Sequence, residues 1–343
     1  MQISIGISVK GAGVSGPPPA PVNTVAPALS FTFRYEGERV DTDNGTWDNS
    51  PTSFTYEWYR NNVLISGETL SQYILTAADA DKEIECKVTA INAGGSSTPA
   101  LSDAIYVFDY DYGQVFYYYE DTREDISILQ NQFMLAIKAA GVWDKLDALC
   151  VFRGSGSGAA LVDWKRVTEV TNIGCDFDTN QGFRGSPPNS AYIDTGFAAT
   201  AGINFTQNNA SRYFFPYEFG TGPMDGSIQG GGGSRNKMLL NNSTDHKINQ
   251  NGTVPLSSTF EYTTTVQPKS IHRTSATDVT LFNGTTSASR TAVSFALSGV
   301  NLYILRDTND YAGHKVAAYA AGASMIAENT AFLAAWNTYI TAL

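Results

Sequence analysis

A tryptophan and a cysteine on two alternating segments most constrain what this chain can fold into. Trp58 precedes a turn at Asn61-Asn62, and Cys86 lies within the segment Ile84-Glu-Cys-Lys-Val-Thr-Ala-Ile-Asn92. Alternation of apolar and polar residues is typical of strands with one buried face. We expect the two side chains to lie on facing strands and to pack across a β-sandwich. The earlier apolar segment, residues 29–35, offers no second cysteine, so packing alone must hold this sandwich together.

The stretch from Trp58 to Gly95 resembles the Ig-like domains of bacterial surface proteins and tailed-phage virion proteins. The shared pattern is a Trp-x-Arg turn, a Tyr-x-Leu strand, an Asp, and an Ile-x-Cys-x-Val-Thr-Ala-x-Asn strand that ends near glycine. The chain departs from the pattern at Asn62, where glycine is usual. It departs from antibody domains at Ile84, where they have a corner tyrosine, but isoleucine fills the same interior space.

Length and charge limit the classes of function. A chain of 343 residues can hold two or three domains, each with its own core. The net charge is −11, from 22 basic and 33 acidic residues. Binding to nucleic acid depends on cations that neutralise phosphates, so we expect no nucleic-acid partner.

The cysteine pattern predicts neither disulfides nor zinc. The chain has three cysteines, Cys86, Cys150 and Cys175, without CxxC spacing. We expect them to be buried apolar side chains in a protein that can fold in a reducing cytosol. A GxGxxG string at 11–16 precedes prolines and not a helix, so it indicates no dinucleotide, and we expect no cofactor.

The first ten residues alternate apolar and polar side chains. They lack the basic start and continuous apolar stretch of a secretion signal, and no segment is long enough to span a membrane, so we expect no membrane insertion. An alternating segment is a strand that needs a neighbour. We therefore predict that residues 1–22 form a docking arm and a Pro/Gly linker, with the arm contacts made by Ile3, Ile5, Ile7 and Val9.

The chain is predicted to be mainly β. We place an Ig-like β-sandwich at 23–108, an aromatic interdomain linker at 109–123, and a concanavalin A-like jelly-roll sandwich with two flanking α-helices at 124–343. Thr122 and Asp125 form a capping box for the first helix, which Gly141 ends. The second helix is expected at 325–342. Short strands with Asn-Gly turns at 251–252 and 283–284 separate the helices.

The region 124–343 resembles a family of tailed-phage tail and virion-surface proteins with a lectin/glucanase-type C-terminal domain. Its motifs follow in the family's order: Leu135-Ala-Ile-Lys-Ala-Ala-Gly-Val-Trp-Asp-Lys-Leu-Asp-Ala-Leu149, Ala159-Ala-Leu-Val-Asp-Trp164, Gly182-Phe-Arg-Gly185, Ala191-Tyr-Ile-Asp-Thr-Gly-Phe197 and Phe332-Leu-Ala-Ala-Trp336.

No catalytic residue emerges from the sequence. Glucanases of this fold hold paired carboxylates on one strand, as in E-x-D-x-x-E, and no such string occurs here. His246, His272 and His314 lack the spacing of a metal site. We therefore expect a protein that is not an enzyme. The alternative is a virion-associated polysaccharide depolymerase.

The sequence offers two weaker candidate sites, one for calcium and one for a ligand. Asp176, Asp178 and Asn180 alternate oxygen side chains as calcium loops do, but the glycine stands one place late and no bidentate Glu follows, so we predict no metal site. Residues 219–258 are rich in Gly, Asn, Ser and Thr, as recognition loops often are. The candidates for ligand binding there are Arg235, Lys237 and Asp245.

The two resemblances imply a phage virion structural protein. It would be made in the host bacterial cytoplasm and displayed on the virion surface as a tail fibre or capsid decoration. Its partners would be other capsid or tail proteins and further copies of itself in a homo-oligomer. It would either bind a host-surface glycan or decorate the particle without a ligand, in both cases without catalysis.

Overall fold

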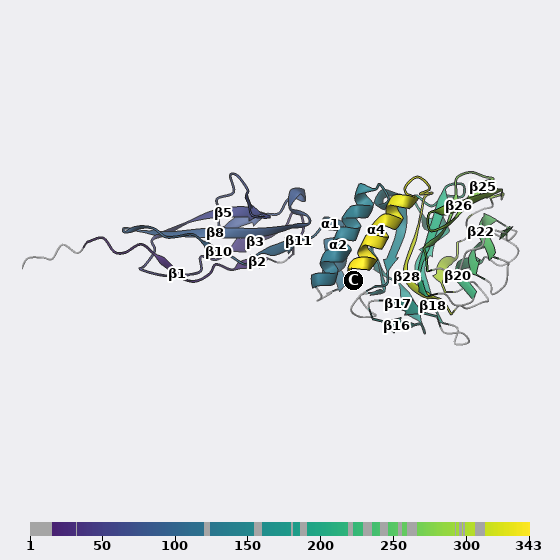
Figure 1. Cartoon of the computed structure of the whole chain (residues 1–343), viewed down its shortest axis with the longest axis horizontal. Coiled ribbons are helices and arrows are strands. Elements are labelled where there is room, and N and C mark those ends of the chain that lie inside the picture. The colour runs from purple at the N-terminus through teal and green to yellow at the C-terminus, as the bar shows by residue number, and fades with distance from the viewer. Residues whose placement is uncertain are drawn as a thin grey trace, which may run out of the picture. The chain divides into compact units, whose positions relative to one another are not determined.

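The chain divides into two compact units, 1–108 and 109–343 (Figure 1). A computed structural model describes residues 16–31, 33–119, 124–153, 160–179, 181–185, 191–218, 222–228, 235–240, 246–252, 256–258, 266–291, 293–294, 297, 299–305 and 313–343. The arm residues Ile3, Ile5, Ile7 and Val9 and the capping residue Thr122 lie outside these ranges. Within them, no helix is long and apolar enough to cross a membrane.

The first unit is an Ig-like sandwich. One sheet has the strand order β10-β8-β5-β6, with β9 and β11 also paired to β8, and a second sheet has the order β2-β3-β7. A separate ribbon pairs β1 with β4. The strands are β1 (Val22–Val25), β2 (Leu29–Phe31), β3 (Arg39–Thr42), β4 (Thr46–Asp48), β5 (Ser53–Arg60), β6 (Val63–Leu64), β7 (Gln72–Ile74), β8 (Lys82–Asn92), β9 (Gly95–Ser96), β10 (Ala100–Leu101) and β11 (Ile105–Val107).

Trp58 and Cys86 are both fully buried, but they do not face one another across the sandwich as the sequence suggested. They are directly opposite residues of the antiparallel strands β5 and β8, in one sheet. Cross-strand neighbours point to the same face, so both side chains enter the core from the same side. The other sheet supplies Val40 and Tyr73, and the Tyr73 ring stacks on Trp58 at 5.5 Å between centroids.

The cysteine prediction is confirmed, because Cys86, Cys150 and Cys175 are all free and buried. Burial raises the pKa of the Cys86 thiol to about 11 and that of Cys175 to about 12. A thiol with such a pKa stays protonated at neutral pH and is a poor nucleophile.

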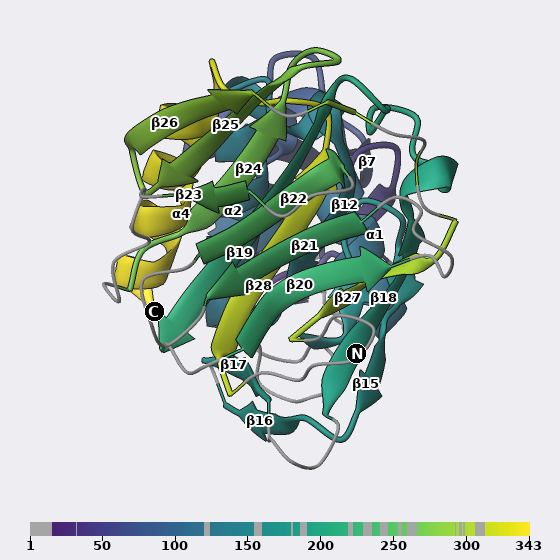
Figure 2. The ribbon, with the colours of Figure 1, turned by 90° about the vertical axis from the view of Figure 1, so that its right-hand side faces the viewer.

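The second unit is a jelly-roll-like sandwich of two sheets (Figure 2). The larger has the order β14-β13-β12-β28-β19-β24-β25-β26, with β17 paired to β28 and to β16. The other has the order β15-β18-β27-β20-β21-β22-β23. The strands are β12 (Leu146–Val151), β13 (Val162–Asp163), β14 (Thr168–Glu169), β15 (Thr171–Ile173), β16 (Asp176–Asp178), β17 (Gly182–Arg184), β18 (Tyr192–Ala198), β19 (Ala210–Glu218), β20 (Gly222–Ile228), β21 (Arg235–Leu240), β22 (His246–Gly252), β23 (Leu256–Ser258), β24 (Lys269–Arg273), β25 (Asp278–Asn283), β26 (Thr286–Thr291), β27 (Asn301–Ile304) and β28 (Lys315–Gly322).

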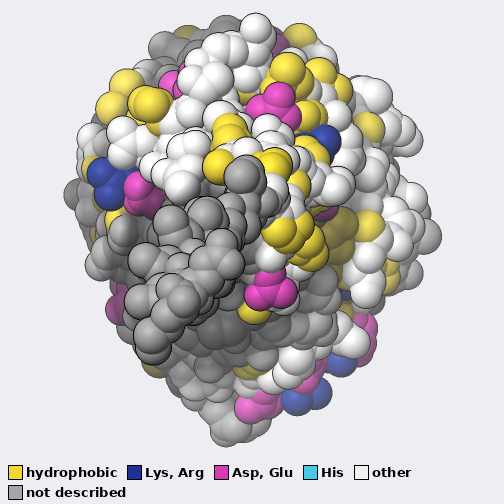
Figure 3. All heavy atoms as spheres, turned by 90° about the vertical axis from the view of Figure 1, so that its left-hand side faces the viewer, with side chains coloured by type: hydrophobic (Ala, Val, Ile, Leu, Met, Phe, Trp, Pro, Cys, Tyr) yellow, Lys and Arg dark blue, Asp and Glu magenta, His cyan; other side chains and the backbone are white. Residues whose placement is uncertain are grey.

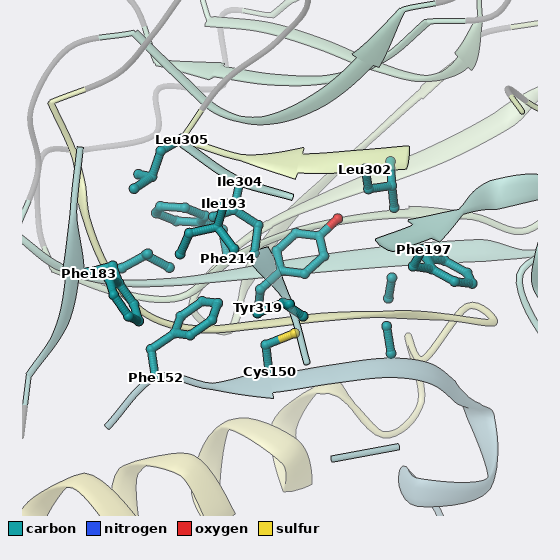
Figure 4. Close-up of a cluster of buried hydrophobic side chains, with 14 of the residues drawn as sticks. Cys150, Phe152, Phe183, Ile193, Phe197, Phe214, Leu302, Ile304, Leu305 and Tyr319 are labelled. Atoms are coloured by element: carbon teal, nitrogen blue, oxygen red, sulfur yellow. The ribbon is translucent and has the colours of Figure 1, made fainter. Parts of the chain in front are cut away.

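The core of this unit lies between the two sheets (Figure 4). Phe152, Phe214 and Tyr319 enter it from the larger sheet, and Ile193 and Leu302 enter it from the other. The mainly β fold class predicted from the sequence is confirmed.

Helices cover the outer face of the larger sheet, which makes this unit three layers thick (Figure 1). They are α1 (Tyr110–Tyr119), α2 (Glu124–Ala139) and α4 (Asn329–Ala342). Because both faces of the larger sheet are covered, all six residues of β12 and all five of β24 are buried. Gly141, with φ of +69°, lies just past the end of α2, as the sequence predicted.

In the segment expected at 109–123 as an aromatic interdomain linker, residues 110–119 form helix α1 and group with the second unit. The Asp109 carboxylate accepts the N–H of Asp111 and so caps the helix. Tyr112 is buried, with its ring 5.5 Å from that of Trp164, and its hydroxyl donates to Gln130 at 2.6 Å. These tertiary contacts make the aromatic run a helix.

The polar loop expected at 219–258 is also wrong in its described residues. They form the four strands β20 to β23, which pair in sequence order within one sheet. Each of these strands pairs antiparallel with the next, so backbone hydrogen bonding compensates for the low hydrophobicity.

His272 on β24 is buried against the segment that precedes α4. Its Nδ1 accepts the backbone N–H of Met325 at 3.1 Å, and its Nε2 lies 2.9 Å from the Ser270 hydroxyl. Burial lowers the pKa of His272 to about 3. The imidazole is therefore neutral in the folded protein.

This burial predicts a loss of stability in acid. Below about pH 6.5 the unfolded chain protonates His272 and the folded chain does not. The free energy of unfolding should therefore fall as pH decreases from about 6.5 to about 3, with a slope of up to about 1.4 kcal/mol per pH unit from this residue. Urea titrations at several pH values should find a shallower slope for His272→Gln. Equal slopes for the two proteins would contradict the assignment.

Candidate recognition surface

A cluster of charged residues around one tyrosine lies at an end of the larger sheet. The strands run in the order β16-β17-β28-β19 there, because β17 pairs with both β16 and β28. The register aligns Asp176 with Arg184, Arg184 with Lys315, and Lys315 with Glu218. Charges of both signs thus form one row across four strands whose residues are far apart in the sequence.

Arg184 joins the two aspartates that the sequence offered as weak calcium ligands. Its Nη2 lies 3.5 Å from an oxygen of Asp176 and 3.7 Å from an oxygen of Asp178. The guanidinium group of Arg184 thus takes the position beside both carboxylates that a calcium ion would need. Asn180 is outside the described residues, and the described residues contain no group of three His, Cys, Asp or Glu side chains that could hold a metal ion.

Tyr217 is the aromatic centre of this cluster. It is half-buried, and its hydroxyl donates to Asp178 at 2.8 Å. Burial, followed by that hydrogen bond, raises the pKa of Tyr217 well above its usual value. The Lys315 ammonium lies 5.7 Å from the centre of the ring and pairs with Glu218. We call Asp176, Asp178, Arg184, Tyr217, Glu218 and Lys315 the Tyr217 cluster.

Arg153 approaches the same tyrosine from the end of β12. Burial lowers the pKa of its guanidinium, while Tyr339 and Tyr217 act electrostatically in the opposite direction. Its Nε is buried and has no hydrogen-bond partner among the described residues.

An aromatic ring next to fixed charged donors and acceptors is well suited to bind a polar ring such as a sugar. The ring supplies apolar contact, and the charged groups orient hydroxyls by hydrogen bonds. The exposed ion pair of Arg184 with Asp176 adds little to stability.

The recognition residues expected from the sequence lie elsewhere. Arg235 and Lys237 are on β21 of the other sheet, where Arg235 pairs with Ile228 and Gly252, and Lys237 pairs with Gly226 and Asn249. Asp245 is outside the described residues. Sequence inspection found Asp176 and Asp178 but missed Tyr217, Arg184 and Lys315, because no local motif links them.

Comparisons with known proteins do not identify a family. No family model and no curated protein matches the chain. Among solved structures, it is similar to the receptor binding domain of botulinum neurotoxin D, with 11% identity, TM-score 0.41 and coverage of 57% of this chain and 53% of that one. It is also similar to a mutant Trypanosoma rangeli sialidase displaying trans-sialidase activity, with 9% identity, TM-score 0.40 and coverage of 92% and 53%.

A third similar structure is domain 4 of AbnA, an extracellular arabinanase from Geobacillus stearothermophilus in complex with arabinotriose. The identity is 12%, the TM-score is 0.34, and the match covers 55% of this chain and 98% of that domain. The chain spans about half the length of the first two proteins. Likenesses this distant identify neither the family nor the ligand of this chain.

Proposed function

We propose that this chain is a structural protein of a phage virion that binds a host-surface glycan without turning it over. The first unit acts as a spacer, and the second unit presents the Tyr217 cluster. The sequence resemblance across 124–343 supports the phage origin, and the Tyr217 cluster is the observation that supports recognition. Many copies on one particle would give avidity to a weak individual site.

Binding without turnover fits the chemistry of the cluster. A glycosidase needs one neutral and one ionised carboxyl group on either side of the bond to be cleaved. In this cluster, Asp176 and Asp178 both contact Arg184, and Glu218 pairs with Lys315. Each of these carboxylates is thus engaged by a neighbouring cation of the cluster.

Removing the ring of Tyr217 should weaken glycan binding. On an array of bacterial capsular and O-antigen polysaccharides, we expect Tyr217→Ala to reduce binding at least about tenfold, because truncating an anchoring aromatic residue typically costs about 2 kcal/mol or more.

Tyr192→Ala is the matched control, since Tyr192 is also half-buried but packs on Tyr303 in the other sheet. Its binding should be unchanged. Equal losses for both variants, or no polysaccharide bound by the unaltered protein, would overturn the proposed recognition. Release of oligosaccharide from a bound polymer would instead indicate a depolymerase.

A further inference from the structure

A lysine with no exposed surface lies at the start of β24. Lysine and arginine side chains are ordinarily at the surface of a protein, as are those visible in Figure 3, because a charged group is costly to remove from water. Lys269 is instead fully buried. It is not part of the Tyr217 cluster, so glycan recognition does not account for its position.

Strand pairing places Lys269 between an aromatic and an amide side chain. The residue directly opposite it is Phe214 on β19 and Asn283 on β25. Residues directly opposite one another in a sheet point to the same face. Phe214 belongs to the hydrophobic core between the two sheets (Figure 4), as do Ile271 and Leu281, two positions along β24 and β25. The side chains of Lys269 and Asn283 therefore point into that core as well.

The lysine and the asparagine contact each other through their functional groups. The Nζ of Lys269 donates to the Oδ1 of Asn283. The atom that carries this oxygen, Cγ, is the electrophilic carbon of the carboxamide. Burial lowers the pKa of Lys269 to about 8, so near neutral pH a fraction of the molecules holds the side chain as a free amine with a lone pair. A desolvated amine beside a carbonyl carbon is an activated nucleophile next to its electrophile.

The backbone holds both groups in place. Lys269–Arg273 pair residue by residue with Val279–Asn283, and the Gly284 N–H donates to the Pro268 carbonyl at 2.9 Å. The second contact matters because the backbone nitrogen after an asparagine can attack the same Cγ by ring closure. Its hydrogen bond to Pro268 opposes that competing reaction. Reacting groups held together by a rigid fold also avoid the entropy cost of meeting in solution.

We propose that Lys269 and Asn283 join in an amide cross-link between β24 and β25. The lone pair of Nζ attacks Cγ of Asn283, the bond between Nζ and Cγ forms, and the bond between Cγ and Nδ2 breaks. Nδ2 takes up the proton that Nζ loses and leaves as ammonia, so the step needs no oxidant, reductant or further reactant. The product is a neutral amide, which is less costly to bury than an ammonium group.

The cross-link does not depend on the proposed function. It joins two neighbouring strands of the larger sheet, β24 and β25, neither of which carries a residue of the Tyr217 cluster. A covalent bond between them would keep the strands paired when the unit is heated or pulled. The chemistry is read from the purified protein alone, so its failure would leave glycan binding and display on a particle untouched.

Mass spectrometry of the full-length protein tests the cross-link. We expect the denatured protein to be lighter than its sequence by one ammonia molecule. Trypsin cleaves after Lys and Arg but not after a modified Lys269, so the digest should contain residues 248–273 joined to residues 274–290. Full sequence mass, both in fresh protein and after prolonged incubation at neutral pH, would overturn the proposal, as would separate peptides 248–269 and 274–290.

Two variants separate the cross-link from other losses of ammonia. Lys269→Arg removes the nucleophile, and Asn283→Asp replaces the amide by a carboxylate, which an amine does not attack. Both variants should have the full mass of their own sequences. Loss of ammonia in Lys269→Arg would mean that ring closure at Asn283 and Gly284 is the reaction, and would overturn the proposal.

Asn44→Asp is the matched control, because Asn44 also precedes a glycine but lies between β3 and β4 of the first unit. This variant should still be lighter by one ammonia molecule, and a full sequence mass would place the loss at Asn44 and contradict the proposal. Circular dichroism establishes whether each variant folds. The joined peptides of the unaltered protein test the cross-link even if Lys269→Arg does not fold.

Discussion

Replacing Phe133 by alanine is expected to destabilise the second unit by about 3–5 kcal/mol. Phe133 is 3% exposed and is the centre of the contact between the helices and the larger sheet. Its ring lies within 6.4 Å, centroid to centroid, of four other aromatic rings, those of Trp164, Phe332, Trp336 and Tyr339. Alanine would leave a cavity that this many rigid rings cannot fill.

Urea denaturation followed by circular dichroism, with hydrogen exchange to assign the change to this unit, measures the effect. Leu129→Ala is the control, because Leu129 is on the same helix but only half-buried, and it should cost much less. If Phe133→Ala lost only about 1 kcal/mol, the average for point variants, the helix layer would not be part of the core.

In the first unit, Trp58→Ala should cost about 3–5 kcal/mol. The indole is fully buried, stacks on Tyr73 and donates its N–H to the Leu70 carbonyl at 2.9 Å. Because Cys86 is a free thiol, no disulfide limits the unfolding of this sandwich.

Trp47→Ala provides the comparison, since Trp47 is half-buried at the edge of the same core. Hydrogen exchange should find faster opening of β5 and β8 in Trp58→Ala and little change in Trp47→Ala. Similar exchange in the two variants would contradict the central position of Trp58.

Strands in both units could be predicted because burial on one face produces alternating apolar residues, and burial on both faces produces a continuous apolar run. Leu146–Val151 is an apolar run, and it forms β12, which is buried on both faces. The two-residue turn after Asn283 needs a positive φ, which Gly284 supplies at +60°. Apolar runs and turn residues involve neighbouring positions only, so they can be recognised in a single sequence.

Features that depend on tertiary contacts could not be predicted in this way. Arg212 and Lys269 are charged residues with no exposed surface, and charge in a sequence ordinarily predicts exposure. The Tyr217 cluster depends on strand pairing among β17, β28 and β19. Arg184 on β17 and Lys315 on β28, for example, are more than a hundred positions apart in the sequence. Only Asp109, a capping residue before the aromatic run, was a local signal that could have indicated helix α1.

The proposed function places this chain on the surface of a phage particle. Immunogold electron microscopy of intact particles, purified from a bacterial culture that expresses the chain and labelled with an antibody against residues 124–343, tests it most directly. We expect gold at regular positions on unbroken particles. Particles that bind no gold when intact, while the free protein in the same lysate is recognised, would contradict it.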